Sequence, residues 1–151
     1  MPENEHAATT PPIVALAFDF GRKRIGVATG DSVTRSAAPL TTLNSGPAGV
    51  DWPAIARLLN EWHPTVLVVG LPTNADGTPA ALTEPARQFA RELKKRHGID
   101  TVMVDERWSS LDASEQLRQA RRSGARPRRV RREDVDAAAA CVILERWLDS
   151  R

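Results

Sequence analysis

The amino-acid sequence predicts an α/β domain in which a mixed β-sheet of five strands is flanked by helices. Short apolar runs near the start are joined by tight turns, as in antiparallel hairpins. In the second half, apolar runs alternate with segments of helical periodicity, which is typical of parallel strands covered by helices. The chain has 151 residues, a length that suits one ordinary domain. We therefore expect a flexible tail over residues 1–12 and one domain over residues 13–151.

Three strands are expected before the first helix. Residues 13–19 (IVALAFD) form an apolar run that ends on an acid. Residues 25–29 (IGVAT) form a second run just after a basic turn, so the pair is predicted to be an antiparallel hairpin. A third strand is expected over residues 37–43, where Pro39 favours an edge position because proline cannot donate a hydrogen bond to a central ladder.

Two buried strands and four helices are expected in the rest of the chain. The strands are indicated by continuous apolar runs at residues 65–70 and 100–106. The helices are indicated by apolar residues at helical spacing, and they are expected to begin near Asp51, Thr83, Ser109 or Ser110, and Asp134. Asp51 and Thr83 are expected to act as N-caps, because their side-chain oxygens can accept hydrogen bonds from the first helical turn.

Composition and local sequence restrict the class of protein. Hydrophobic residues make up 41% and charged residues 26% of the chain, which excludes collagen-like, wholly disordered and membrane classes. The polar start lacks a basic segment followed by an apolar one, so we expect neither a signal peptide nor an anchor, and we expect a cytoplasmic protein without membrane partners. The single cysteine, Cys141, lies in the run AAAACVIL and is expected to be a buried, inert thiol.

Eight arginines without any acidic residue among them lie between positions 118 and 132. Such a cluster suits a phosphate-binding surface. A solvated basic loop with no partner explains it equally well. The eight residues are Arg118, Arg121, Arg122, Arg126, Arg128, Arg129, Arg131 and Arg132.

Three acids are candidates for a metal site. Asp19 and Glu106 end predicted buried strands, at the edge of the sheet where ligands usually bind, and Asp136 lies in the first turn of the last helix. Carboxylate oxygens suit Mg²⁺ or Mn²⁺. Each acid also has a structural explanation. Asp19 could form a turn, Glu106 could pair with Arg107, and Asp136 could interact with the helix dipole. Zinc is not expected, because the histidines are scattered at His6, His63 and His97.

Four segments together resemble a known family. DFGRKRIGVATGD, VVGLPTNADGT, DERWSS and VDAAAACVIL occur in this order and are similar to the motifs of the YqgF family, also called the Holliday-junction resolvase family. The similarity extends from Ile13 to Trp147. It implies a ribonuclease H-like fold and a metal-dependent nuclease.

The resemblance also implies which acids hold the metal. These are Asp19 of DFG, Glu106 of DER and Asp136 of VDAAAA, whereas Asp105 is disfavoured, in agreement with the alternation of side chains along a strand. Asp134 competes with Asp136, which the register of the motif favours. Phosphates flanking the cut are expected to contact Arg22, Lys23 and Arg107, and the arginine cluster to add contacts from Arg128, Arg129, Arg131 and Arg132.

Two nucleic-acid substrates are consistent with the resemblance. Members of the family are associated with trimming the 5′ end of precursor 16S rRNA, which we favour, while the older family name indicates four-way DNA junctions. A non-catalytic nucleic-acid-binding or transcription-associated module is a further alternative. Junction resolution needs a dimer. The best candidate for the dimer interface is the surface formed by Trp108 and the helix that begins near Ser110. Because no second apolar helix face is evident, we expect a monomer and RNA as the partner.

Overall fold

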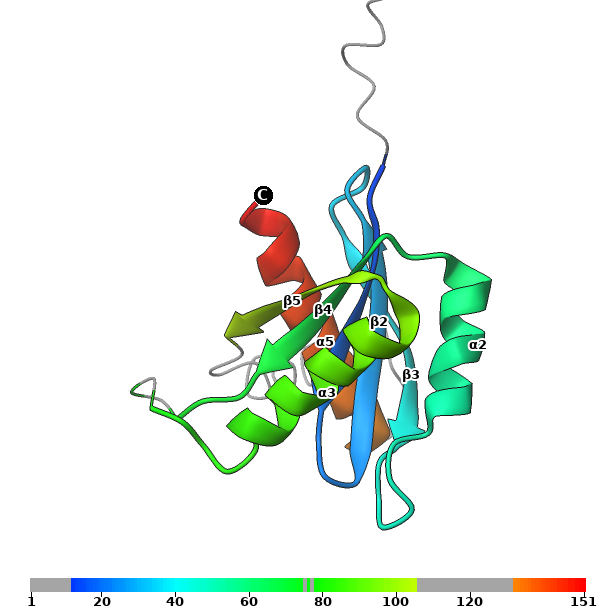
Figure 1. Cartoon of the computed structure of the whole chain (residues 1–151). Coiled ribbons are helices and arrows are strands. Elements are labelled where there is room, and N and C mark those ends of the chain that lie inside the picture. Colours follow the sequence, from blue (N-terminus) through cyan, green and yellow to red (C-terminus); the bar gives the residue numbers. More distant parts are fainter. Residues whose placement is uncertain (1–11, 75, 77, 106–131) are drawn as a thin grey trace, which may run out of the picture.

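The structure is a computed structural model that describes residues 12–74, 76, 78–105 and 132–151. In the described part, a five-stranded sheet has helices on both faces (Figure 1). In chain order the elements are β1 (Val14–Phe20), β2 (Arg24–Asp31), β3 (Ala37–Asn44), α2 (Trp52–Trp62), β4 (Val66–Leu71), α3 (Thr83–His97), β5 (Asp100–Asp105) and α5 (Arg132–Asp149). The predicted helix after Ser109 or Ser110 lies outside the described residues.

The sheet is mixed, as the sequence predicts. Its strand order is β3-β2-β1-β4-β5, in which β1, β2 and β3 pair antiparallel while β1, β4 and β5 run parallel. Strand β3 lies at the edge, and Pro39 pairs with Ala28 where the register shifts between Val27 and Ala28. The expected edge position of the proline-containing strand is therefore confirmed.

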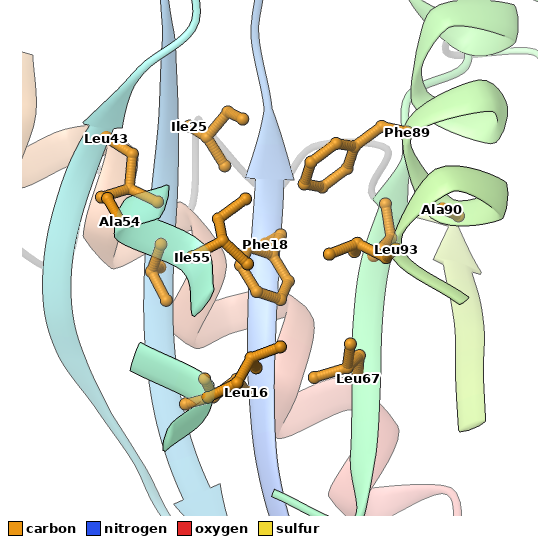
Figure 2. Close-up of a cluster of buried hydrophobic side chains, with 13 residues drawn as sticks. Leu16, Phe18, Ile25, Leu43, Ala54, Ile55, Leu67, Phe89, Ala90 and Leu93 are labelled. Carbon is orange, nitrogen blue, oxygen red and sulfur yellow. The ribbon is translucent and has the colours of Figure 1, made fainter. Parts of the chain in front are cut away.

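Alternating residues of β1 face two different cores. Leu16 and Phe18 pack under α2 and α3, together with Ile55 of α2 and Phe89 of α3 (Figure 2). On the opposite face, small residues such as Ala17 of β1 lie against α5. Because side chains alternate along a strand, Asp19, which follows Phe18, lies on the face that α5 covers.

The two helices over the first core begin differently. Asp51 caps α2 as predicted, since its Oδ1 accepts a hydrogen bond from the Ala54 amide at 3.1 Å. The prediction that Thr83 caps α3 is wrong, because Thr83 is the first residue of the helix and Leu82 occupies the cap position. The Thr83 hydroxyl instead accepts a hydrogen bond from the Ala80 amide at 2.7 Å and donates one to the Pro72 carbonyl. The loop before α3 thus uses the oxygen that a cap would need.

Helix α5 carries the second core. Its alanine-rich first half and the apolar residues that follow are buried against the sheet, among them Cys141 at 7% exposure. Burial, with a smaller contribution from the charge of Glu145, raises the pKa of the Cys141 thiol to about 12. The expected buried thiol is therefore confirmed. Among the helices that the structure describes, none is long and apolar enough to cross a membrane.

Candidate active site

Asp19 lies at the end of the central strand, on the face that α5 covers. It is the penultimate residue of β1 and pairs with Gly26 of β2 across the antiparallel ladder. Cross-strand partners project their side chains to the same face of a sheet. Asp19 is partly exposed and takes part in polar contacts within the protein. The carboxylate therefore lies at an accessible edge, beside the place where α5 begins.

Gly26 allows the backbone of α5 to approach this edge. A Cβ atom built on Gly26 would lie 1.9 Å from the carbonyl oxygen of Asp136, a separation that no side chain can adopt. Only glycine therefore permits this contact between β2 and the second turn of α5. Because Gly26 is also the partner of Asp19, the contact brings Asp136 next to the strand position that carries Asp19.

An ion pair fixes the Asp136 side chain. Its Oδ2 accepts a hydrogen bond from Nε of Arg24 at 2.6 Å, and the two side chains are only 25% (Arg24) and 23% (Asp136) exposed. Arg24 is the first residue of β2 and, by alternation, shares the face of Gly26. The sequence analysis did not select Arg24, although its spacing of two residues from Gly26 could have placed it on this face.

Strand β5 ends with Asp105 at the same edge of the sheet, with β4 between it and β1. Val102 and Val104 pack in the core under α5, so Asp105 faces the other side of the sheet. There its Oδ1 accepts a hydrogen bond from the Thr73 hydroxyl at 3.1 Å. This orientation agrees with the expectation that Asp105 is not the ligand. Glu106, the predicted ligand, lies outside the described residues.

The donor atoms that are described suit a hard divalent cation. Asp19 and Asp136 contribute carboxylates to one face, and oxygen ligands are those that Mg²⁺ and Mn²⁺ prefer. Within the described ranges, no group of three or more His, Cys, Asp or Glu side chains could hold a metal ion. The side chain of Asp134, the competing acid, lies outside the described residues.

Two of the predicted phosphate-binding residues flank the site. Arg22 and Lys23 are exposed in the turn that joins β1 to β2, directly after the strand that carries Asp19. The Lys23 carbonyl accepts a hydrogen bond from the Ser45 amide at 2.8 Å, which fastens the turn to the end of β3. The other predicted contacts, Arg107, Arg128, Arg129 and Arg131 and the side chain of Arg132, lie outside the described residues.

A hollow of about 940 Å³ lies elsewhere, between α3, β5 and the end of α5. Its lining includes Arg91, Lys95, Met103 and Trp147, and contains neither Asp19 nor Asp136.

The strand order, with β1, β2 and β3 antiparallel and β1, β4 and β5 parallel, is that of the ribonuclease H-like fold. Solved structures of low sequence identity share the fold. RuvC of Thermus thermophilus in complex with a Holliday junction substrate has a TM-score of 0.54 at 14% identity, over 92% of this chain and 96% of that one. The fowlpox virus resolvase with Holliday junction DNA has a TM-score of 0.58 at 12% identity, over 91% and 98% of the two chains.

The chain belongs to the RuvX family, described as Holliday junction resolvase, whose model matches residues 13–150. A relative from Nitrosospira multiformis is 46% identical over 151 residues, covering 100% of this chain and 97% of its own. One from Legionella pneumophila (strain Philadelphia 1) is 44% identical over 138 residues, covering 91% and 96%. Both are named "Putative pre-16S rRNA nuclease". The family identified from the four motifs is thereby confirmed.

Proposed function

We propose that this chain is a metal-dependent nuclease that processes the 5′ end of precursor 16S rRNA. The observation that carries the proposal is the close approach of the Asp136 backbone to Gly26, the cross-strand partner of Asp19, at one edge of the sheet. The names of the relatives that cover nearly the whole chain support the choice of substrate.

Three carboxylates would hold the metal in this proposal. Asp19 is the central ligand, because it lies on the rigid middle strand of the sheet. Asp136 approaches from α5, and Glu106, which lies outside the described residues, is assigned from the resemblance of its DER segment to the family motif. Bound Mg²⁺ or Mn²⁺ supplies charge neutralisation at the scissile phosphate and lowers the pKa of the attacking water.

Basic side chains around the carboxylates would bind the phosphates of the substrate. Arg22 and Lys23 are exposed next to Asp19, so they can hold phosphates on either side of the bond that is cut. Arg107 and the arginine cluster, assigned from the sequence, would extend these contacts along the substrate. Such phosphate contacts position a nucleic acid without reading its sequence.

A direct comparison of substrates tests the proposal. The purified protein is incubated with end-labelled precursor 16S rRNA or with a labelled four-way DNA junction, each in Mg²⁺, in Mn²⁺ and in chelator. We expect cleavage of the rRNA near its mature 5′ end, only when a divalent metal is present. Cleavage of the junction alone would contradict the choice of substrate, and binding without cleavage would favour a non-catalytic module.

Junction resolution is the second candidate function, favoured by the resolvases that share the fold. Resolution cuts two strands at symmetric positions, so it requires two copies of a site with a single set of carboxylates. We propose a monomer, which is compatible with processing one RNA end. Light scattering with and without a junction tests this point, and a stable dimer would favour the resolvase.

A further inference from the structure

We propose that Arg24 couples the binding of metal to the binding of nucleic acid. In this scheme the guanidinium of Arg24 holds Asp136 while the site lacks metal, and moves to a substrate phosphate when metal takes the carboxylate. The inference rests on the proposed function, because it assumes that Asp136 is a metal ligand. Arg24 would therefore contact Asp136 when metal is absent and the substrate phosphate when metal is bound.

The contact of Arg24 with Asp136 is stronger than an ordinary surface ion pair. The distance from Nε to Oδ2 is 2.6 Å, the two residues are 112 positions apart in sequence, and both side chains are mostly buried. Charge-assisted hydrogen bonds of this length are about twice as strong as neutral ones. Asp136 is therefore held in one orientation before any metal arrives.

The same contact opposes metal binding. A guanidinium that touches a ligand carboxylate offsets its charge and occupies one of its oxygens, so a divalent cation must compete with it. Partial burial strengthens this competition, because a low dielectric screens charges less than water does. Removal of the Arg24 charge should therefore raise the affinity of the site for metal.

A substrate phosphate offers Arg24 an alternative partner. Arg24 begins β2 directly after the exposed pair Arg22 and Lys23, so a phosphate held by that turn would lie close to its guanidinium. Guanidinium groups bind phosphate with paired hydrogen bonds. Once Arg24 has moved to the phosphate, both Asp136 oxygens are available to metal. By linkage, each ligand then raises the affinity for the other.

A purely structural role makes a different prediction. If Arg24 only fastened α5 to β2, its replacement would lower stability and leave metal affinity unchanged or reduced. The backbone contact between Gly26 and Asp136 already docks the helix without Arg24. Metal affinity therefore separates the two roles, whereas a loss of cleavage would not.

The test is calorimetric titration of the full chain with Mn²⁺, with and without an oligonucleotide of 2′-O-methyl phosphorothioate RNA that resists cleavage. Heats of Mn²⁺ binding to the free oligonucleotide are subtracted. For the wild type we expect Mn²⁺ affinity to rise by about 5-fold or more when the oligonucleotide is bound, within the usual range of coupling. For Arg24→Gln we expect higher affinity without the oligonucleotide and no further rise with it.

Arg57→Gln is the matched control, since Arg57 is exposed on α2, over the opposite face of the sheet, and its loss changes the net charge equally. It should retain the wild-type coupling.

Unchanged or weaker Mn²⁺ affinity in folded Arg24→Gln would overturn the inference. So would an absence of coupling in the wild type, a result that needs no variant to fold. If the wild type binds no Mn²⁺ at all, both the proposed nuclease function and the role of Arg24 are contradicted. If it binds Mn²⁺ without coupling, only the role of Arg24 is contradicted.

Discussion

Replacing Gly26 with alanine adds one methyl group at the point where α5 rests on β2. The new Cβ would lie 1.9 Å from the Asp136 carbonyl oxygen and 2.9 Å from the Ala137 amide nitrogen. Real Cβ contacts are not shorter than 3.0 Å, so the second turn of α5 must retreat by about 1.1 Å. Because the obstructing atoms are backbone, no rotation of a side chain can relieve the overlap.

Two measurable losses should follow from this displacement. Overpacking of a well-packed contact typically costs about 1–3 kcal/mol, which denaturation by urea can measure. A displacement near 1 Å also carries the Asp136 carboxylate away from Asp19, and misplacement of this size lowers rates on the order of 100-fold. The assays are urea denaturation and metal-dependent cleavage of precursor rRNA.

Gly46→Ala is the matched control, because a Cβ built on Gly46 meets nothing within 4 Å. The control should retain the stability and cleavage rate of the wild type. Wild-type stability and cleavage in Gly26→Ala as well would refute the reasoning, since they would mean that α5 does not rest on Gly26.

Three further outcomes are expected. Asp51→Ala should lower the free energy of unfolding by about 1 kcal/mol, because the bond from Oδ1 to the Ala54 amide is lost, and denaturation midpoints check this. Cys141 should resist iodoacetamide at about pH 9 in the native protein, because its raised pKa keeps the thiol protonated, and it should react after unfolding. Mass spectrometry detects the adduct, and fast labelling of the native protein would contradict the burial of the thiol. A fourfold alanine variant of the arginine cluster should flatten the dependence of log affinity on log salt, and an unchanged slope would mean a solvated loop. The four replaced residues are Arg128, Arg129, Arg131 and Arg132.

The sheet could be predicted from sequence because its signals are local. Apolar runs, the basic turn before Ile25 and Pro39 each act within a few residues, and they sufficed for the strand directions and the edge position of β3. The prediction that Thr83 caps α3 was wrong because a threonine near a helix start is an ambiguous signal. A threonine at a helix start can bond either to the helix or to the preceding loop, and Thr83 bonds to the loop at Pro72 and Ala80.

The site was predicted only in part, because its contacts join distant segments. The acids could be selected from strand ends and motifs, yet the role of Gly26 depends on how closely α5 packs, which no local pattern encodes. The pairing of Arg24 with Asp136 spans 112 positions and depends on the register of β1 with β2. The spacing of two residues puts Arg24 on the face of Gly26, but the sequence alone does not show that Asp136 lies over that face.

The most direct test of the nuclease proposal is a cleavage assay of Asp19→Asn in Mg²⁺ and in Mn²⁺. This change removes one negative charge and nearly preserves volume, so the variant should fold, with a stability equal to or above that of the wild type as repulsion among the carboxylates falls. Asp100→Asn is the control, because Asp100 begins β5, at the opposite end of the strand from the site, and its Oδ1 forms an ion pair with Nζ of Lys94 at 3.3 Å. We predict that Asp19→Asn abolishes metal-dependent cleavage of precursor 16S rRNA while Asp100→Asn cleaves normally. Near-normal cleavage by pure, folded Asp19→Asn would contradict the assignment.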